Sequence, residues 1–131
     1  MTVGGFWNVA DVDAALAAGE GGQLRWNWLA HGEMSTANII HAEPGGPEGG
    51  FLHYHAEHDE TLFIASGTGT FDLGGDERPI GPGTVIFIPR GTIHEPKLMS
   101  GGTMLSIYAP AFDPEQPDRY FVTTHDDPHE T

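Results

Sequence analysis

The sequence contains no cysteine among its 131 residues. This absence excludes disulfides, thiolate zinc sites and cysteine nucleophiles. Any metal must therefore be held by nitrogen and oxygen atoms, and any redox activity must rest on the metal itself. The length fits one domain with a single core.

Basic residues are also scarce. Five Lys and Arg residues stand against 19 acidic ones, the formal net charge is −14, and Lys97 is the only lysine. Such a surface repels phosphate backbones and anionic lipids, so we expect neither a nucleic acid nor a membrane as a partner. The acidic excess is typical of high solubility and also of adaptation to salt, and composition does not separate these two explanations.

Long apolar runs are missing as well. No stretch approaches membrane-spanning length, and the opening residues MTVGGFWNVADVD lack the basic start and apolar core of a secretory leader. We therefore expect a cytoplasmic protein.

Glycine and proline are abundant, with 19 and 10 copies, and they divide the chain into short apolar runs. Regularly spaced runs between glycine-rich turns favour an all-β barrel or sandwich. The stretch GGDERPIGPG at 74–83 is expected to be one of these turns. The expected strands cover 23–30, 35–43, 51–55, 60–67, 69–73, 84–89, 92–96 and 103–109.

Helix is expected only near the start, over Val9 to Ala18, where Asn8 or Asp11 can cap the first turn and Gly19 can end the last. The proline-rich and acidic end of the chain is unsuited to a central strand, although 120–122 can form an edge strand. We divide the chain into an N-terminal arm with a short helix (1–22), a β-barrel (23–112) and an acidic C-terminal extension (113–131).

The stretch HYHAEHDE at 53–60 concentrates polar residues in apolar surroundings. In an extended strand His53 and His55 point to the same side, and Glu60 can face them if the intervening residues turn the chain back. Two imidazoles and a carboxylate are ligands that divalent transition metals accept. The alternative is a solvated polar turn, the commoner setting for polar residues. His58 shares a face with Glu60, so it either approaches the site or forms a solvated ion pair.

Two tryptophans, Trp26 and Trp28, share one face of an expected strand. They can wall a pocket for an apolar ligand, although core packing is the commoner role of such a pair.

Two motifs resemble those of the cupin family. HYHAEHDETLFIASG matches the pattern H-x-H-x4-E-x6-G, and GTVIFIPRGTIH matches G-x5-P-x-G-x2-H, ending at His94. The resemblance spans about Leu24 to Ala109. It implies a jelly-roll β-barrel that is open at one end, with one divalent metal on the inner wall. The ligands implied by the motifs are His53, His55, Glu60 and His94.

This ligand set leaves one or two metal positions for a substrate, and it does not identify the metal, because Fe(II), Mn, Ni, Co, Cu and Zn all accept it. The resemblance favours a small dioxygenase acting on a small organic molecule, in which Glu60 both binds the metal and accepts a proton. A Lewis-acid isomerase, cyclase or lyase would use the same site, and so would a metal or ligand binding module without turnover. Members of the family commonly pair through their strands. We therefore expect a homodimer, with the exposed-edge candidates FWNV at 6–9 and RYFV at 119–122.

Overall fold

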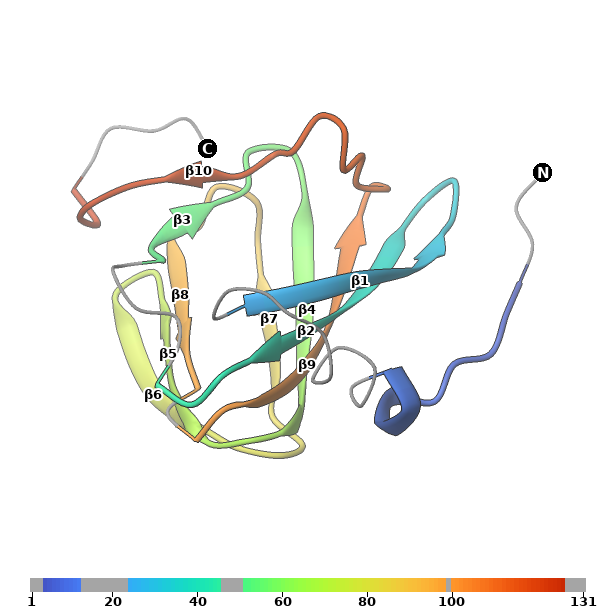
Figure 1. Ribbon diagram of the computed structural model, residues 1–131. Helices are drawn as coiled ribbons and strands as arrows, with labels where there is room; N and C mark the ends of the chain where they lie inside the picture. Colours follow the sequence, from blue (N-terminus) through green and yellow to red (C-terminus); the bar gives the residue numbers. More distant parts are fainter. Residues whose placement is uncertain (1–3, 13–23, 46–50, 99, 127–131) are drawn as a thin grey trace.

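Two five-stranded antiparallel sheets face each other and form a barrel (Figure 1). The computed structural model describes residues 4–12, 24–45, 51–98 and 100–126. One sheet has the strand order β1-β2-β9-β4-β7 and the other β10-β3-β8-β5-β6. The all-β barrel prediction is confirmed. The strands are β1 (Leu24–His31), β2 (Thr36–Ala42), β3 (His53–Tyr54), β4 (Asp59–Ser66), β5 (Gly69–Leu73), β6 (Asp76–Ile80), β7 (Val85–Ile88), β8 (His94–Lys97), β9 (Gly102–Ala109) and β10 (Tyr120–Phe121).

Side chains alternate between the barrel interior and the outer face along the strands. In β4, Glu60, Leu62 and Ile64 are buried, while Phe63 between them faces outward. This two-residue period places apolar side chains inside and others on the outer face. The buried core cluster consists of Ala42, Leu62, Ile64, Phe71, Ile80, Ile86, Ile88, Leu98 and Met104.

The expected N-terminal helix begins where the sequence predicts. The side-chain oxygen of Asn8 accepts a hydrogen bond from the backbone nitrogen of Ala10 at 2.9 Å, which confirms Asn8 as the cap. Residues 9–12 are helical, and the remainder of the predicted helix lies outside the described residues. In the described part of the chain, no helix is long and apolar enough to cross a membrane.

One expected turn is instead a strand. The stretch predicted as a turn at 74–83 contains β6, which pairs with β5 from Gly69↔Ile80 to Leu73↔Asp76. The turn prediction holds at both ends of this stretch. Gly74 and Gly75 join β5 to β6, and a second turn at Pro82 and Gly83 follows β6. Gly74, Gly75 and Gly83 have positive φ. The side chains of β6 are exposed except at Ile80, because the strand forms the edge of its sheet. Charged residues and proline are common on such edges and obscure the strand pattern.

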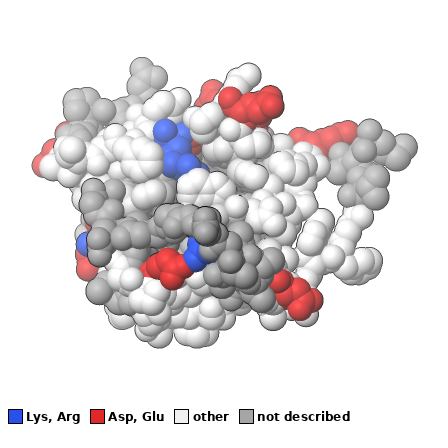
Figure 2. Space-filling view, viewed as in Figure 1, with Lys and Arg blue, Asp and Glu red and all other residues white. Residues whose placement is uncertain are grey.

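The C-terminal segment returns to the barrel. Residues 120 and 121 form β10, which pairs with β3 through Tyr120↔Tyr54 and Phe121↔His53, so the predicted edge strand is confirmed. This pairing brings Tyr120 and Phe121 beside the first histidine motif. On the face shown in Figure 2, several separate carboxylate groups and few basic side chains are visible.

Candidate metal centre

The four residues of the predicted ligand set converge inside the barrel. His53 and His94 are directly opposite each other on β3 and β8, and His55 follows β3. The ligand atoms of these three histidines, called here the histidine cluster, all lie within 4.8 Å of one another. Glu60 reaches them from β4 in the facing sheet. Its Oε1 lies 3.3 Å from Nε2 of His55 and 3.4 Å from Nε2 of His94.

Each ring of the histidine cluster is oriented through its Nδ1 atom. The Nδ1 of His53 contacts the carbonyl of Phe51 at 2.6 Å, and that of His94 contacts the carbonyl of Thr92 at 2.9 Å. The Nδ1 of His55 contacts the carbonyl of Asp118 at 2.6 Å. A carbonyl only accepts hydrogen bonds, so each Nδ1 carries the proton. Each Nε2 is therefore left with a free lone pair, as in histidines that bind metals.

The residues present fit a divalent transition metal. The Nε2 atoms of His55 and His94 are buried and have no hydrogen-bond partner among the described residues. An unpaired buried acceptor is costly, and metal coordination removes that cost. Three imidazoles with one carboxylate form a nitrogen and oxygen donor set that many such metals accept.

The charge states of the cluster suit coordination. Burial, together with the neighbouring His94 and His55, holds the pKa of His53 well below its usual range, so this ring is neutral at pH 7. Burial alone would raise the pKa of Glu60, but hydrogen bonds from His55 and His94, when their Nε2 atoms also carry a proton, hold it well below its usual range. A metal bound to the Nε2 lone pairs would take the place of those protons. The Glu60 carboxylate therefore stays ionised. Its second oxygen, Oε2, accepts a hydrogen bond from Oγ of the buried Ser106 at 2.5 Å.

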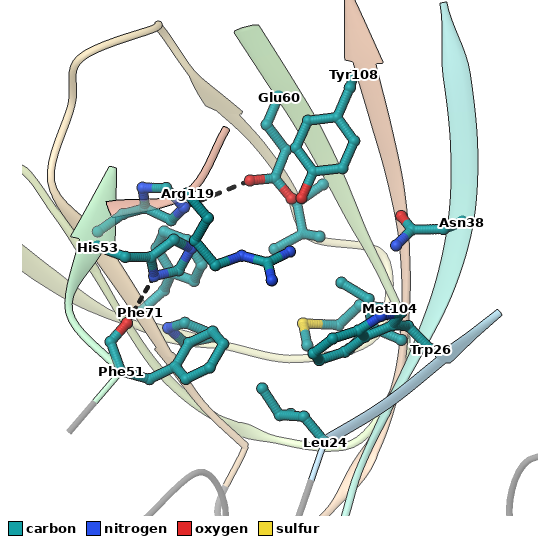
Figure 3. A pocket seen from close by; sticks show the side chains of 14 residues that line it. Leu24, Trp26, Asn38, Phe51, His53, Glu60, Phe71, Met104, Tyr108 and Arg119 are labelled. Carbon is teal, nitrogen blue, oxygen red and sulfur yellow. Dashed lines mark hydrogen bonds and ion pairs between the residues drawn. The ribbon is translucent and has the colours of Figure 1, made fainter. Parts of the chain in front are cut away.

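A hollow opens beside the cluster, called here the central hollow (Figure 3). Its volume is about 440 Å³, including the part open to solvent. His53, Glu60 and His94 form part of its wall, so a bound molecule would lie against three of the four converging residues. The described residues that line it are Leu24, Trp26, Asn38, Ile40, Phe51, His53, Glu60, Leu62, Phe71, His94, Pro96, Met104, Tyr108 and Arg119.

The two tryptophans have different positions. Trp26 lines the central hollow and is partly exposed. Trp28 is half-buried and stacks on Phe112 with ring centroids 5.5 Å apart, 6.2 Å from the ring of Tyr108. Trp26 thus has the predicted pocket position, while Trp28 packs against aromatic side chains and does not line the hollow.

His58 lies outside the histidine cluster. Its Nδ1 contacts a carboxylate oxygen of Asp118 at 2.6 Å, and its Nε2 contacts the carbonyl of Ala111 at 3.2 Å. The side chain is buried, so this pair is not the solvated ion pair considered above. His58 instead ties the turn before β4 to the C-terminal segment.

Sequence reasoning missed four residues of the site, namely Ser106, Tyr108, Asp118 and Arg119. Ser106 and Tyr108 share a face of β9 with Met104, and strand alternation was the signal available for them. Burial, and then the Glu60 charge, raise the pKa of Tyr108, so its hydroxyl stays protonated. For Arg119 the only signal was its rarity, because the chain has only five basic residues.

Comparison with known proteins identifies relatives of the chain. A relative from Aquifex aeolicus (strain VF5), described as an uncharacterized protein, is 37% identical over 62 residues, which cover 47% of this chain. The match covers 51% of that protein, so the chain spans about half the length of the curated relative it matches.

Solved structures with a similar fold include three small proteins. A conserved protein with a double-stranded β-helix domain from Klebsiella pneumoniae has a TM-score of 0.72 at 16% identity, covering 91% of this chain and 97% of that one. KdgF from Halomonas sp. has a TM-score of 0.65 at 22% identity, covering 72% and 84%. The nucleoside dehydratase Pac13 from Streptomyces has a TM-score of 0.61 at 23% identity, covering 79% and 81%. At these identities the likeness shows the fold alone.

The family match includes most of the site. Residues 38–108 match the cupin domain family Cupin_2, and this range contains the histidine cluster and Glu60. Because the match covers more than half of the 131 residues, the chain belongs to the cupin domain family.

Proposed function

We propose that this cupin is a metal-dependent enzyme acting on a small organic molecule, and that its reaction is of the dioxygenase type. One observation carries the proposal. The unpaired imidazole nitrogens and the ionised Glu60 converge at the wall of a hollow that is lined mainly by apolar side chains. A molecule in the central hollow would therefore meet the metal ligands directly.

The chain's own residues have separate roles in this proposal. His53, His55 and His94 would hold the metal through Nε2, and Glu60 would complete the set through Oε1. A divalent transition metal supplies Lewis acidity when bound and, if redox-active, electron transfer to dioxygen. The ionised Glu60 can also accept a proton from the substrate, while Ser106 holds its second oxygen in place.

The lining of the central hollow favours a largely apolar substrate. Leu24, Phe51 and Met104 are among its apolar members, and they offer no hydrogen bonds to a substrate. A polyhydroxylated molecule would leave buried hydroxyls unpaired there, at a substantial cost. Asn38 has a buried Oδ1 without a partner among the described residues, and this atom can accept a hydrogen bond from one hydroxyl. Enolic or diketone compounds, which are flat and carry few polar groups, suit this pocket.

The test begins with elemental analysis of protein purified without an affinity tag. Oxygen uptake is then measured on the iron(II)-reconstituted form with a panel of enolic and diketone compounds. Stoichiometric iron, manganese, nickel or copper together with uptake supports the proposal. Zinc with no uptake contradicts the dioxygenase type, and absence of any metal contradicts the metal centre itself.

A Lewis-acid isomerase, cyclase or lyase is the second candidate, and Tyr108 favours it. Tyr108 lines the central hollow, and burial keeps its hydroxyl protonated, so it can donate a hydrogen bond to a developing oxyanion while Glu60 accepts a proton. The fold neighbour Pac13 is a nucleoside dehydratase. Turnover by the zinc form without oxygen would distinguish this candidate, whereas binding without any product would indicate a binding module.

A further inference from the structure

Arg119 extends from the segment before β10 into the central hollow. Figure 3 shows its guanidinium group projecting between Tyr108 and Trp26. The guanidinium carbon lies 5.2 Å from the centroid of the Trp26 ring. Stacking on an aromatic face fixes the plane of the guanidinium group and leaves its edges available for hydrogen bonds.

The charge of Arg119 has no carboxylate partner among the described residues. Three other basic side chains have one, since Arg25 pairs with Glu43, Arg78 with Asp76 and Lys97 with Glu95. The Nε of Arg119 is buried and has no hydrogen-bond partner in the same part of the chain.

The contacts that Arg119 does make, with the Trp26 ring and the Tyr108 hydroxyl, leave its positive charge unneutralised. A cation that is partly removed from water without a counter-ion is costly, so an anion in the hollow would be stabilised.

Glu60, the carboxylate among the described lining residues, contacts the histidine cluster and Ser106 rather than Arg119. Its Oε1 lies 3.3 and 3.4 Å from Nε2 of His55 and His94, and its Oε2 accepts a hydrogen bond from Ser106. Among the described residues it forms no ion pair with Arg119. The lining of the central hollow therefore has two charged groups that do not pair with each other, the Glu60 carboxylate beside the histidine cluster and the Arg119 guanidinium. Apolar side chains make up most of the remaining wall.

The position of Arg119 is fixed in advance by its neighbour in the chain. Asp118 accepts hydrogen bonds from the backbone nitrogens of Ala56 and Glu57 at 2.8 and 2.7 Å, and its carbonyl contacts His55. The backbone beside Arg119 is thus attached to the turn that carries the first histidine motif. A binding group held in place before the ligand arrives loses little entropy on binding.

We propose that Arg119 binds a carboxylate group, so that the ligand of this site is a small organic carboxylate with an apolar body. The inference rests on the proposed function for the identity of the pocket and adds the chemical class of the substrate. The planar guanidinium matches a carboxylate through two parallel hydrogen bonds. The apolar body then fills the hollow and lies against the metal ligands.

The test measures binding by isothermal titration calorimetry on the full chain, both metal-free and zinc-loaded. The probes are benzoate, phenylacetate and butanoate, their neutral amides, and inorganic phosphate. At least one carboxylate is expected to bind, with its amide weaker by about tenfold or more. Arg119→Met, which keeps an apolar stem, should weaken that carboxylate by about tenfold or more, and Arg119→Lys by less. Arg78→Met, which removes an exposed arginine outside the hollow, should leave the affinity unchanged.

Three outcomes would overturn the inference: no carboxylate binds to either form, carboxylates bind Arg119→Met as tightly as the natural chain, or phosphate binds more tightly than every carboxylate. Circular dichroism of each variant excludes misfolding as the cause of a loss, and Arg119→Lys provides a second variant if Arg119→Met is unstable. The metal-free titrations separate this inference from the proposed function. Carboxylate binding that depends on Arg119 without any oxygen uptake would contradict only the dioxygenase type, whereas uptake without such binding would contradict only the carboxylate class.

Discussion

The backbone carbonyl of Asp118 accepts a hydrogen bond from Nδ1 of His55 at 2.6 Å, although the two residues are 63 positions apart. The carboxylate of Asp118 also accepts hydrogen bonds from the backbone nitrogens of Ala56 and Glu57 and contacts Nδ1 of His58. One buried residue of the C-terminal segment thus orients one ring of the histidine cluster and holds the turn that follows it.

Replacing Asp118 by alanine should therefore destabilise the fold. The change leaves two backbone nitrogens and the buried His58 without their acceptor. Hydrogen bonds to a charged group are individually strong, so we expect a loss of about 2–4 kcal/mol in the free energy of unfolding. Urea denaturation measures it. Asp113→Ala is the control, because Asp113 is exposed and, within the described part of the chain, forms hydrogen bonds only in its local turn. Equal stability of the two variants would contradict this role for Asp118.

The contribution of Asp118 should also depend on pH. Burial would raise its pKa, but hydrogen bonds from His58, Glu57 and Ala56 hold the pKa below its ordinary value of 3.8. A carboxyl with a lowered pKa in the folded state stabilises fully above its unfolded pKa and loses that effect as pH falls through the folded pKa. The stability difference between the natural chain and Asp118→Asn should thus be constant near pH 5 and shrink below 3.8. Urea denaturation from pH 5 to pH 3 tests this, and a difference that grows on acidification would contradict it.

Removing one imidazole of the histidine cluster should abolish metal retention. His94→Ala or His53→Ala deletes a nitrogen donor from a group whose ligand atoms lie within 4.8 Å of one another. We expect protein purified with stoichiometric metal to lose nearly all of it, measured by elemental analysis after dialysis. His125→Ala is the matched control, since His125 pairs with Asp72 on the surface. Unchanged metal content in both cluster variants would show that the metal binds elsewhere.

Gly69 should tolerate no side chain because of a steric clash rather than because of a positive φ. Gly69 is not among the glycines with positive φ. Instead, a Cβ atom there would lie 1.8 Å from the carbonyl oxygen of Lys97, so β5 and β8 would have to separate. We expect Gly69→Ala to cost about 3 kcal/mol or more. Gly75→Ala, with φ of +95° and no atom within 4 Å of the added Cβ, should cost about 1–2 kcal/mol. Chemical denaturation compares the two, and an equal cost would contradict the steric explanation.

The convergence of His53, Glu60 and His94 could be predicted because its signals are local. Strand alternation places His53 and His55 on one side, but the full set with Glu60 and His94 came from the resemblance of two short motifs to the cupin family. The same local logic predicted the strands that carry these residues and the cap at Asn8.

The remaining features depend on contacts between distant parts of the chain. Nothing near Asp118 or Arg119 in the sequence shows that this segment returns to β3, because the pairing of a short edge strand is decided by the folded partner. Alternation placed Trp26 and Trp28 on one face but could not say which one reaches the hollow, since that depends on depth along the barrel. The sequence pattern did not predict β6, because exposed charged residues and a proline are equally typical of a turn and of a sheet edge.

Association into a homodimer remains a prediction. Both segments proposed to form the dimer contact, at 6–9 and 119–122, contain exposed aromatic side chains. Phe6 and Trp7 of the N-terminal arm, and Tyr120 of the edge strand β10, all present large apolar surfaces to solvent. An edge strand and exposed aromatic side chains are suited to pairing with a second copy, so light scattering should give twice the mass of one chain. Tyr120→Lys or Phe6→Ser should shift the mass toward the monomer by placing charge or polarity in that contact.

Val85→Ser, on the exposed face of β7 in the other sheet, should leave the mass unchanged. A monomeric mass of the natural chain at every concentration would contradict the homodimer. If only Val85→Ser dissociates the dimer, the interface lies on the outer face of β7 instead.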